Sequence, residues 1–284
     1  KANGHRVFQQ CRSDSHEAAQ GTFVLPTLIE LNHIGELQRE VFGPVLHLVR
    51  YARNDLDQLL DQINATGYGL TLGVHTRIDE TIDRVVSRAH AGNVYVNRNM
   101  VGAVVGVQPF GGEGLSGTGP KAGGPMYLLR LLSERPADAL AQTFAQADRA
   151  APPERRAHGA LLAPLHALAQ WAGAEGQTLL AGTCERFAAQ TQSGTSHTLT
   201  GPTGERNVYR LVPRATVLCV ASELADQLTQ LAAVLACGGM ALWPQSQAAN
   251  RTKVPPQVQA RIALVNDAVN DASVDIGVVL HHGD

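Results

Sequence analysis

Short apolar runs rich in β-branched residues alternate with helical patterns in the first third of the chain, and this alternation constrains the fold more than any other feature. Strands are expected at 45–51, 70–75 and 93–97. Between them, apolar residues recur at helical spacing over 54–67 and 78–92, two stretches of about three turns that each end at a glycine. Because strands separated by helices of this length pair in parallel, the sequence predicts an α/β fold with an open, mostly parallel sheet.

A second alternation of strands and helices begins near Arg206. Its expected elements are, in chain order, a strand at 216–221, a helix that ends at Gly238-Gly239, a strand at 241–243, a helix at 257–265 and a strand at 275–280. This layout is half of a doubly wound, Rossmann-like domain. The residues before it are rich in Ala, Gln and Leu and interrupted at Pro152-Pro153. We therefore expect three regions: a domain part at 1–135, a helical linker at 136–205 and a truncated Rossmann-like domain at 206–284.

The predicted Rossmann-like unit lacks the residues that bind a dinucleotide. After the strand at 216–221 the chain reads Ser222-Glu223-Leu224-Ala225-Asp226-Gln227, without a glycine that would admit a pyrophosphate. Glu223 would also place a negative charge at the helix N-terminus that normally receives the phosphate. Residues 206–284 are thus expected to keep the layout without the chemistry.

Glycine is concentrated between Gly102 and Gly124, where it occupies nine of 23 positions. Average usage of about 7% would give fewer than two. A helix or central strand of this composition would carry a large entropic cost, so the stretch is predicted to be a loop whose backbone approaches another group closely. It contains no G-x-x-x-x-G-K-[ST] pattern and is not predicted to be a phosphate-binding P-loop.

Composition excludes several classes of function. A net charge of −2 with 17% charged residues argues against a nucleic-acid-binding surface. The chain has neither an apolar run of about 18 residues nor a signal segment, so no membrane span is expected. Its cysteines do not indicate a disulfide framework, which fits a cytoplasmic protein. Its first methionine is Met100, and it stops just after the apolar run 276–280. Both ends therefore indicate a piece excised from a longer protein.

The cysteines and histidines do not indicate a metal site. No C-x-x-C pair is present, which argues against structural zinc and a redox dithiol. Cys219 and Cys237 lie in apolar surroundings and are expected to be buried thiols, whereas Cys11 lies in a polar stretch. His281 and His282 are adjacent in a predicted strand and would point apart.

Several motifs resemble the aldehyde dehydrogenase superfamily in order and spacing. They are Glu40-Val-Phe-Gly-Pro-Val45, Tyr68-Gly-Leu-Thr71, Gly92-Asn-Val-Tyr-Val-Asn97 and Gln108-Pro-Phe-Gly-Gly112. The continuous segment 97–125 resembles more closely the glutamate-γ-semialdehyde dehydrogenase half of the bifunctional bacterial enzymes of proline catabolism. Gly201-Pro-Thr-Gly-Glu-Arg-Asn207 is similar to the C-terminal extension of the longer members. The fold implied is a partial aldehyde dehydrogenase catalytic domain, a helical linker and a Rossmann-like C-terminal domain.

The resemblance implies a role for five residues. Glu40 matches the glutamate whose two oxygens accept hydrogen bonds from the nicotinamide ribose hydroxyls. Phe42 matches the aromatic residue that packs beside that ribose. Gly102 and Ala103 match the loop whose backbone N–H groups bind the α-carboxylate of the substrate. Phe110 matches the aromatic residue that lines the aldehyde-bearing chain.

The activity implied is the NAD-dependent oxidation of glutamate-γ-semialdehyde, formed from pyrroline-5-carboxylate, to glutamate. In the family, the nucleophilic cysteine, the general-base glutamate, the oxyanion asparagine and the NAD-binding domain lie upstream of the matched residues. FAD would serve only the upstream proline dehydrogenase half. No cysteine of this chain lies in a matching motif, so we expect no catalytic residue here and no activity of this chain alone.

Other interpretations remain open on the residues themselves. Glu40 could be a solvated charge, Phe42 and Phe110 could be core residues, and Gly102-Ala103 could form only a tight turn. Residues 151–284 could be a structural module that covers a catalytic domain or mediates association. The segment 113–135 corresponds to the part that leads into an oligomerisation flap, so a homo-oligomer is expected. A stand-alone binding protein for acidic metabolites is a third possibility.

Overall fold

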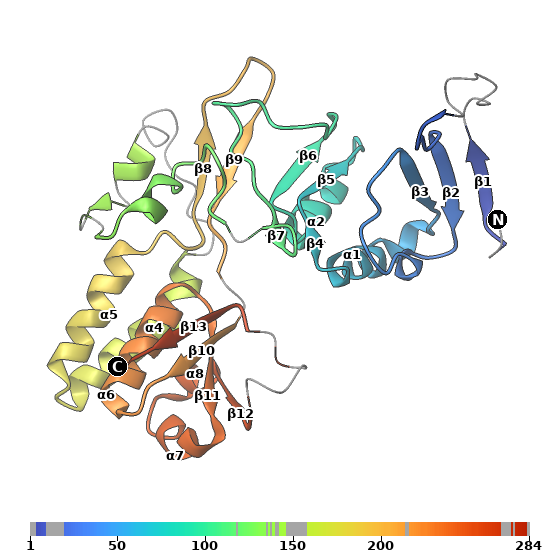
Figure 1. Ribbon diagram of the computed structural model, residues 1–284. Coiled ribbons are helices and arrows are strands. Elements are labelled where there is room, and N and C mark those ends of the chain that lie inside the picture. The colour runs from blue at the N-terminus through green and yellow to red at the C-terminus, as the bar shows by residue number, and fades with distance from the viewer. Residues whose placement is uncertain are drawn as a thin grey trace. The chain divides into compact units, whose positions relative to one another are not determined.

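The computed structural model describes residues 4–9, 20–117, 119–134, 136, 138–139, 142–145, 158–213, 216–267, 274 and 276–282. The chain divides into two compact units, Lys1–Arg130 (the first unit) and Leu131–Asp284 (the second unit) (Figure 1). Both units combine helices with parallel strands, which confirms the predicted α/β class. Cys11 and Pro152-Pro153 lie outside the described residues, and the three predicted regions remain predictions.

The described residues of the first unit form one three-stranded sheet and two strand pairs. In the sheet, β1 (Arg6–Gln9) runs antiparallel to β2 (Thr27–Leu31), which runs parallel to β3 (Val45–Val49). The pairs are β5 (Thr71–Val74) parallel to β6 (Asn93–Val96) and β4 (Tyr68–Gly69) antiparallel to β7 (Glu113–Gly114). The helices are α1 (Leu56–Ala65) and α2 (Asp79–Arg88), with short 3-10 turns at Ile34–Glu36, Arg53–Asp55 and Leu128–Leu131.

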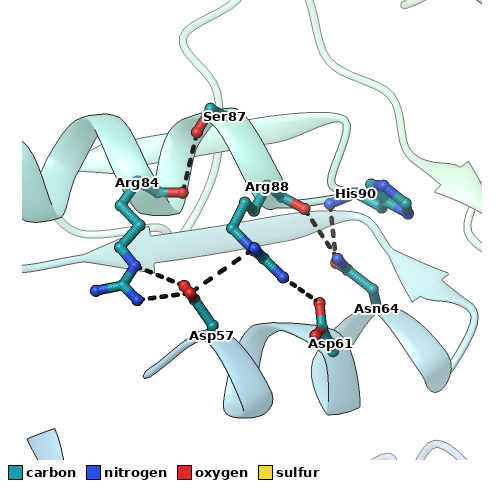
Figure 2. A network of polar contacts seen from close by, with 7 residues as sticks. All are labelled: Asp57, Asp61, Asn64, Arg84, Ser87, Arg88 and His90. Carbon is teal, nitrogen blue, oxygen red and sulfur yellow. Dashed lines mark hydrogen bonds and ion pairs between the residues drawn. The ribbon is translucent and has the colours of Figure 1, made fainter. Parts of the chain in front are cut away.

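Charged side chains join α1 to α2 (Figure 2). The guanidinium of Arg84 donates two hydrogen bonds of 2.5 Å to the carboxylate of Asp57. Arg88 donates to Asp61 at 2.6 Å and lies 3.8 Å from Asp57. The hydrogen bond from Arg84 holds the pKa of the Asp57 carboxyl below its ordinary value. Because the apolar faces of both helices are short, this network adds directional contacts to the packing between them.

The end of α2 is fixed by an asparagine of α1. Asn64 Nδ2 donates to the carbonyl oxygen of Arg88 at 2.9 Å, and Asn64 Oδ1 accepts from the amide of His90 at 2.9 Å (Figure 2). The helix therefore ends at Arg88, with Ala89 as its C-cap. The prediction that Gly92 ends this helix is wrong, since the cap comes from another helix.

The second unit contains a four-stranded sheet and an antiparallel hairpin. All neighbours in the sheet pair in parallel, in the order β12 (Ile262–Val265), β11 (Met240–Pro244), β10 (Thr216–Val220), β13 (Val278–His281). The hairpin joins β8 (Ser196–Leu199) to β9 (Asn207–Arg210). The helices whose bounds lie within the described residues are α4 (His158–Ala174), α5 (Thr178–Gln190), α6 (Leu224–Ala236), α7 (Ala248–Arg251) and α8 (Pro256–Gln259).

The core of the second unit lies between α4, α5, α6 and the parallel sheet. Leu165, Leu168, Leu231 and Trp243 are completely buried in it. The predicted apolar face of α6 points into this core, and the helix stops as predicted at Gly238, whose φ of +76° closes the last turn. None of the helices in the described ranges is long and apolar enough to cross a membrane.

The predicted helix at 257–265 is wrong in its second half. Helix α8 covers only Pro256–Gln259, and Ile262–Val265 forms strand β12 beside β11. A four-residue apolar run fits either a helix or a strand by periodicity alone. Parallel pairing with β11 buries this run as a strand, and the Arg251 side chain donates to the carbonyl oxygens of Gln259 and Ile262 at the junction.

The described cysteines differ in exposure. Burial raises the pKa of the Cys184 thiol to about 11 and that of Cys219 to about 12. Cys219 is buried as predicted, but Cys237 is exposed, because it follows the last turn of α6 at the surface. The described residues contain no group of three or more side chains placed to hold a metal ion.

Two adjacent leucines of α5 allow a matched test of the second unit. Leu180 is 8% exposed and Leu179 is 89% exposed. We expect Leu180→Ala to lower the free energy of unfolding by about 2–5 kcal/mol because it leaves a cavity, and Leu179→Ala to change it by less than about 0.5 kcal/mol. Urea unfolding followed by tryptophan fluorescence measures both, and equal losses would contradict the packing of α5.

The Asp57–Arg84 pair should make the stability of the fold depend on pH. A carboxyl whose pKa is lowered by folding stabilises the fold above its unfolded pKa of about 3.9, and this contribution is lost as the pH falls through the lower folded pKa. We expect Asp57→Asn to destabilise the protein in urea at pH 6, and its difference from the wild type to shrink below about pH 4. Asp83→Asn, at an exposed position of α2, is the control. The same pH profile for both variants would exclude the pair as the cause.

Candidate functional site

The chain leaves β6 at an asparagine with an unusual backbone conformation. Asn97 has a φ of +55°. Its side chain accepts from the amide of Thr76 and donates to the carbonyl oxygen of Thr76, both at 2.9 Å. Asparagine tolerates this left-handed region better than most residues, and its two bonds fix the turn. The direction in which the chain enters the following loop is therefore fixed at Asn97.

The loop at 99–108 presents two adjacent backbone N–H groups. The amide of Val101 donates to Asn99 Oδ1 at 3.3 Å, and that of Val104 donates to Gln108 Oε1 at 3.1 Å. Between them, the half-buried Gly102 and Ala103 donate their amides to no acceptor within the described residues. Successive free N–H groups of this kind can bind an anion. The two residues predicted for the substrate carboxylate thus have amides that could bind an anion, and their role stays a prediction.

Phe110 is held in place by its backbone. Its amide donates to the carbonyl oxygen of Ala122 at 3.0 Å, and the amide of Ala122 donates back at 2.9 Å. Asn93, at the start of β6, donates to the carbonyl oxygen of Pro109 at 2.8 Å and accepts from the amide of Gly111 at 3.1 Å. The aromatic side chain is half-buried. Its position is therefore coupled to β6, the strand that leads into the 99–108 loop.

The glycine-rich segment packs its own backbone closely. A Cβ on Gly92 would lie 1.8 Å from the carbonyl oxygen of Gly111. The ammonium of Lys121 donates to that same oxygen at 2.8 Å and also to the carbonyl oxygen of Gly92. Partial removal from water lowers the pKa of Lys121. Gly92 is therefore a point of close backbone approach, and the predicted close contact of the glycine-rich loop is in part with its own chain.

The two residues predicted for the cofactor lie in the segment between the first 3-10 turn and β3. Glu40 is exposed, and within the described chain its carboxylate has no hydrogen bond or ion pair. It lines a hollow of about 570 Å³, together with His33, His47, Gln62 and others. Phe42 is 89% exposed, so it is not a core residue of the first unit.

Four polar residues that the sequence analysis did not single out hold this site. They are Asn93, Asn97, Gln108 and Lys121, and each binds backbone groups of the loops described above. Amide and ammonium side chains within or just before a glycine-rich stretch are the one signal that could have indicated them. Their backbone partners are distant in sequence or reached by a turn, so only the structure identifies them.

Comparison with known proteins finds a family model that matches the first part of the chain. Residues 1–135 match the sequence model of the aldehyde dehydrogenase family. The whole chain is 56% identical to the bifunctional protein PutA of Escherichia coli K12, of which it covers 22%. Over 39% of its length it is 45% identical to the 1-pyrroline-5-carboxylate dehydrogenase 2 of Bacillus subtilis, covering 21% of that protein. The chain thus spans about a fifth of the length of these curated relatives.

A solved structure shares the fold over almost the whole chain. Proline utilization A from Corynebacterium freiburgense matches 97% of this chain and 26% of its own chain, with a TM-score of 0.53 and 22% sequence identity. At that identity the likeness concerns the fold alone.

Substitutions at two glycines, Gly92 and Gly102, test which of them is in close contact with another backbone segment. We expect Gly92→Ala to lower the free energy of unfolding by about 1–3 kcal/mol, because the new methyl group meets backbone atoms that cannot rotate away. Gly102→Ala is the control, since a Cβ there meets nothing within 4 Å, and it should change stability by less than about 0.5 kcal/mol. Hydrogen exchange at the β5 and β6 amides in urea measures both. Equal effects would contradict the Gly92–Gly111 approach.

Proposed function

We propose that this chain, whose residues 1–135 carry the sequence of the aldehyde dehydrogenase family, forms part of a cytoplasmic NAD-dependent dehydrogenase. Its substrate is glutamate-γ-semialdehyde, which forms from pyrroline-5-carboxylate, and its product is glutamate. The pair of unpaired amides at Gly102 and Ala103 carries this proposal, because it selects an aldehyde that also bears a carboxylate.

The α-carboxylate of the substrate would accept hydrogen bonds from both amides. Gly102 and Ala103 have small side chains, so the anion can come close to the backbone. Phe110 would line the carbon chain that carries the aldehyde, and its paired backbone keeps that wall in a fixed position. The loop would thus orient the aldehyde group relative to the reacting atoms.

Glu40 and Phe42 fit the ribose end of a nicotinamide cofactor. The Glu40 carboxylate is exposed and offers two acceptor oxygens to a diol. The Phe42 side chain is open to packing by a ligand. NAD, when bound, would accept the hydride of the aldehyde carbon. The residues of this chain would bind and orient the ribose.

The nucleophile would come from outside this chain. Cys184 and Cys219 are buried, and their raised pKa values keep them as thiols near neutral pH. Cys237 is exposed, yet the protein atoms around it remove part of its contact with water and raise the pKa of its thiol as well. These properties support the proposal that this chain supplies substrate and cofactor contacts but no catalytic residue.

Two features of the second unit favour a structural role for it. Its parallel sheet order, β12-β11-β10-β13, supports a Rossmann-like assignment. Glu223 is the N-cap of α6 and Asp226 lies in its first turn, so two carboxylates occupy the position where a dinucleotide phosphate would bind. We propose that this unit is non-catalytic and serves the assembly of a homo-oligomer.

A substitution of Glu40 tests the proposed function. In the full-length protein, supplied with pyrroline-5-carboxylate and NAD, we expect Glu40→Ala to raise the KM for NAD about tenfold, because a charged acceptor for the ribose is lost. Glu40→Gln, which keeps one acceptor oxygen, should raise it less. NADH absorbance measures both.

Glu80→Ala, at an exposed position of α2 outside the hollow that Glu40 lines, is the control and should leave the KM for NAD unchanged. An unchanged KM for NAD in Glu40→Ala would remove the ribose role. A wild-type protein that is inactive with this substrate would leave the structural role as the function of the whole chain.

A further inference from the structure

We infer that Gln108 and Asn99 are positioning residues that set the substrate specificity of the 99–108 loop. Their side-chain oxygens hold the amides of Val104 and Val101, on either side of the free amides of Gly102 and Ala103. The inference rests on the proposed binding of a carboxylate to those two amides.

The geometry of the peptide units gives the reason. Two N–H groups bind one anion only if their peptide planes keep a fixed relative orientation. The N–H groups of Gly102 and Ala103 belong to two consecutive peptide units. The peptide unit directly before these two carries the Val101 N–H, and the one directly after them carries the Val104 N–H. A hydrogen bond to each flanking amide therefore fixes both ends of the two-peptide segment.

Apolar packing cannot replace these bonds. The side chains of Val101 and Val105 are 93% and 97% exposed, and Val104 is 49% exposed. The loop is therefore not anchored by its valines. Gln108, by contrast, is 9% exposed, and Val104 is bound from two sides, since its carbonyl oxygen also accepts from the amides of Val107 and Gln108. A hydrogen bond in such a partly dry environment restricts motion more than one in water.

The effect should appear in specificity and not in the chemical step. Without the acceptor on Gln108, the peptide between Ala103 and Val104 can rotate, and the two amides no longer point at one carboxylate. An aldehyde without a carboxylate makes no use of these amides. The selectivity ratio, kcat/KM for pyrroline-5-carboxylate divided by kcat/KM for propanal, isolates this effect.

The test uses the full-length protein and Gln108→Met, which keeps the side-chain length and removes the acceptor. We expect the selectivity ratio to fall about 3- to 10-fold, the loss of one ordinary hydrogen bond, because kcat/KM for pyrroline-5-carboxylate falls more than kcat/KM for propanal. Gln58→Met, at an exposed position of α1, is the matched control and should keep the wild-type ratio. Equal losses with both substrates, or an unchanged ratio, would overturn the inference for Gln108.

A second pair of variants keeps the inference testable if Gln108→Met does not fold. Asn99 is exposed, and Asn99→Ala removes the acceptor while Asn99→Ser keeps an uncharged one. The ratio should fall with alanine and be largely restored with serine; equal ratios for the two variants would overturn the role of Asn99. A wild-type ratio near one would instead contradict the proposed carboxylate recognition itself.

Discussion

The close approach of Gly92 to Gly111 is the contact on which the candidate site of the first unit depends. The glycine-rich segment can reach the start of β6 only because Gly92 has no side chain between the two backbones. Asn93 and Lys121 then join the same backbone atoms by hydrogen bonds. The position of Phe110, and the start of the loop that carries Gly102 and Ala103, follow from this junction.

The helices of the first unit support that junction from the other side. Asn64 ends α2 by binding the backbone of Arg88 and of His90, on either side of Ala89. Ala89 lies three residues before Gly92. The Asp57–Arg84 and Asp61–Arg88 pairs join the two helices through exposed or half-exposed charges. Surface pairs of this kind contribute modestly to stability, but they have a defined geometry and so restrict how the helices slide past each other.

The second unit is stabilised in a different way. Its sheet and the helices α4, α5 and α6 bury a continuous apolar core that includes Trp243 and Leu231. Two glutamines of α6 also enter this environment, and Gln230 donates to the carbonyl oxygens at the ends of β10 and β13. A single amide group thus joins the two strands where the sheet order reverses, at the edge where an enzyme of this layout would bind its ligand. The buried side chain of Gln230 therefore fills the space at this edge of the sheet.

The amino-acid pattern alone predicted the α/β class, the strand positions around residues 45–97, the apolar face of α6 and the motifs of the candidate loop, because these follow from local periodicity and residue type. It did not distinguish a helix from a strand at Ile262–Val265, since a four-residue apolar run fits both until β11 pairs with it. Gly92 shows the same limit, because its role depends on a backbone 19 residues away. The sequence did not reveal which of the described amides are free, because hydrogen bonds to the backbone groups of loops follow no periodic pattern, whether the partners are near, as Gln108 is to Val104, or distant, as Lys121 is to Gly92.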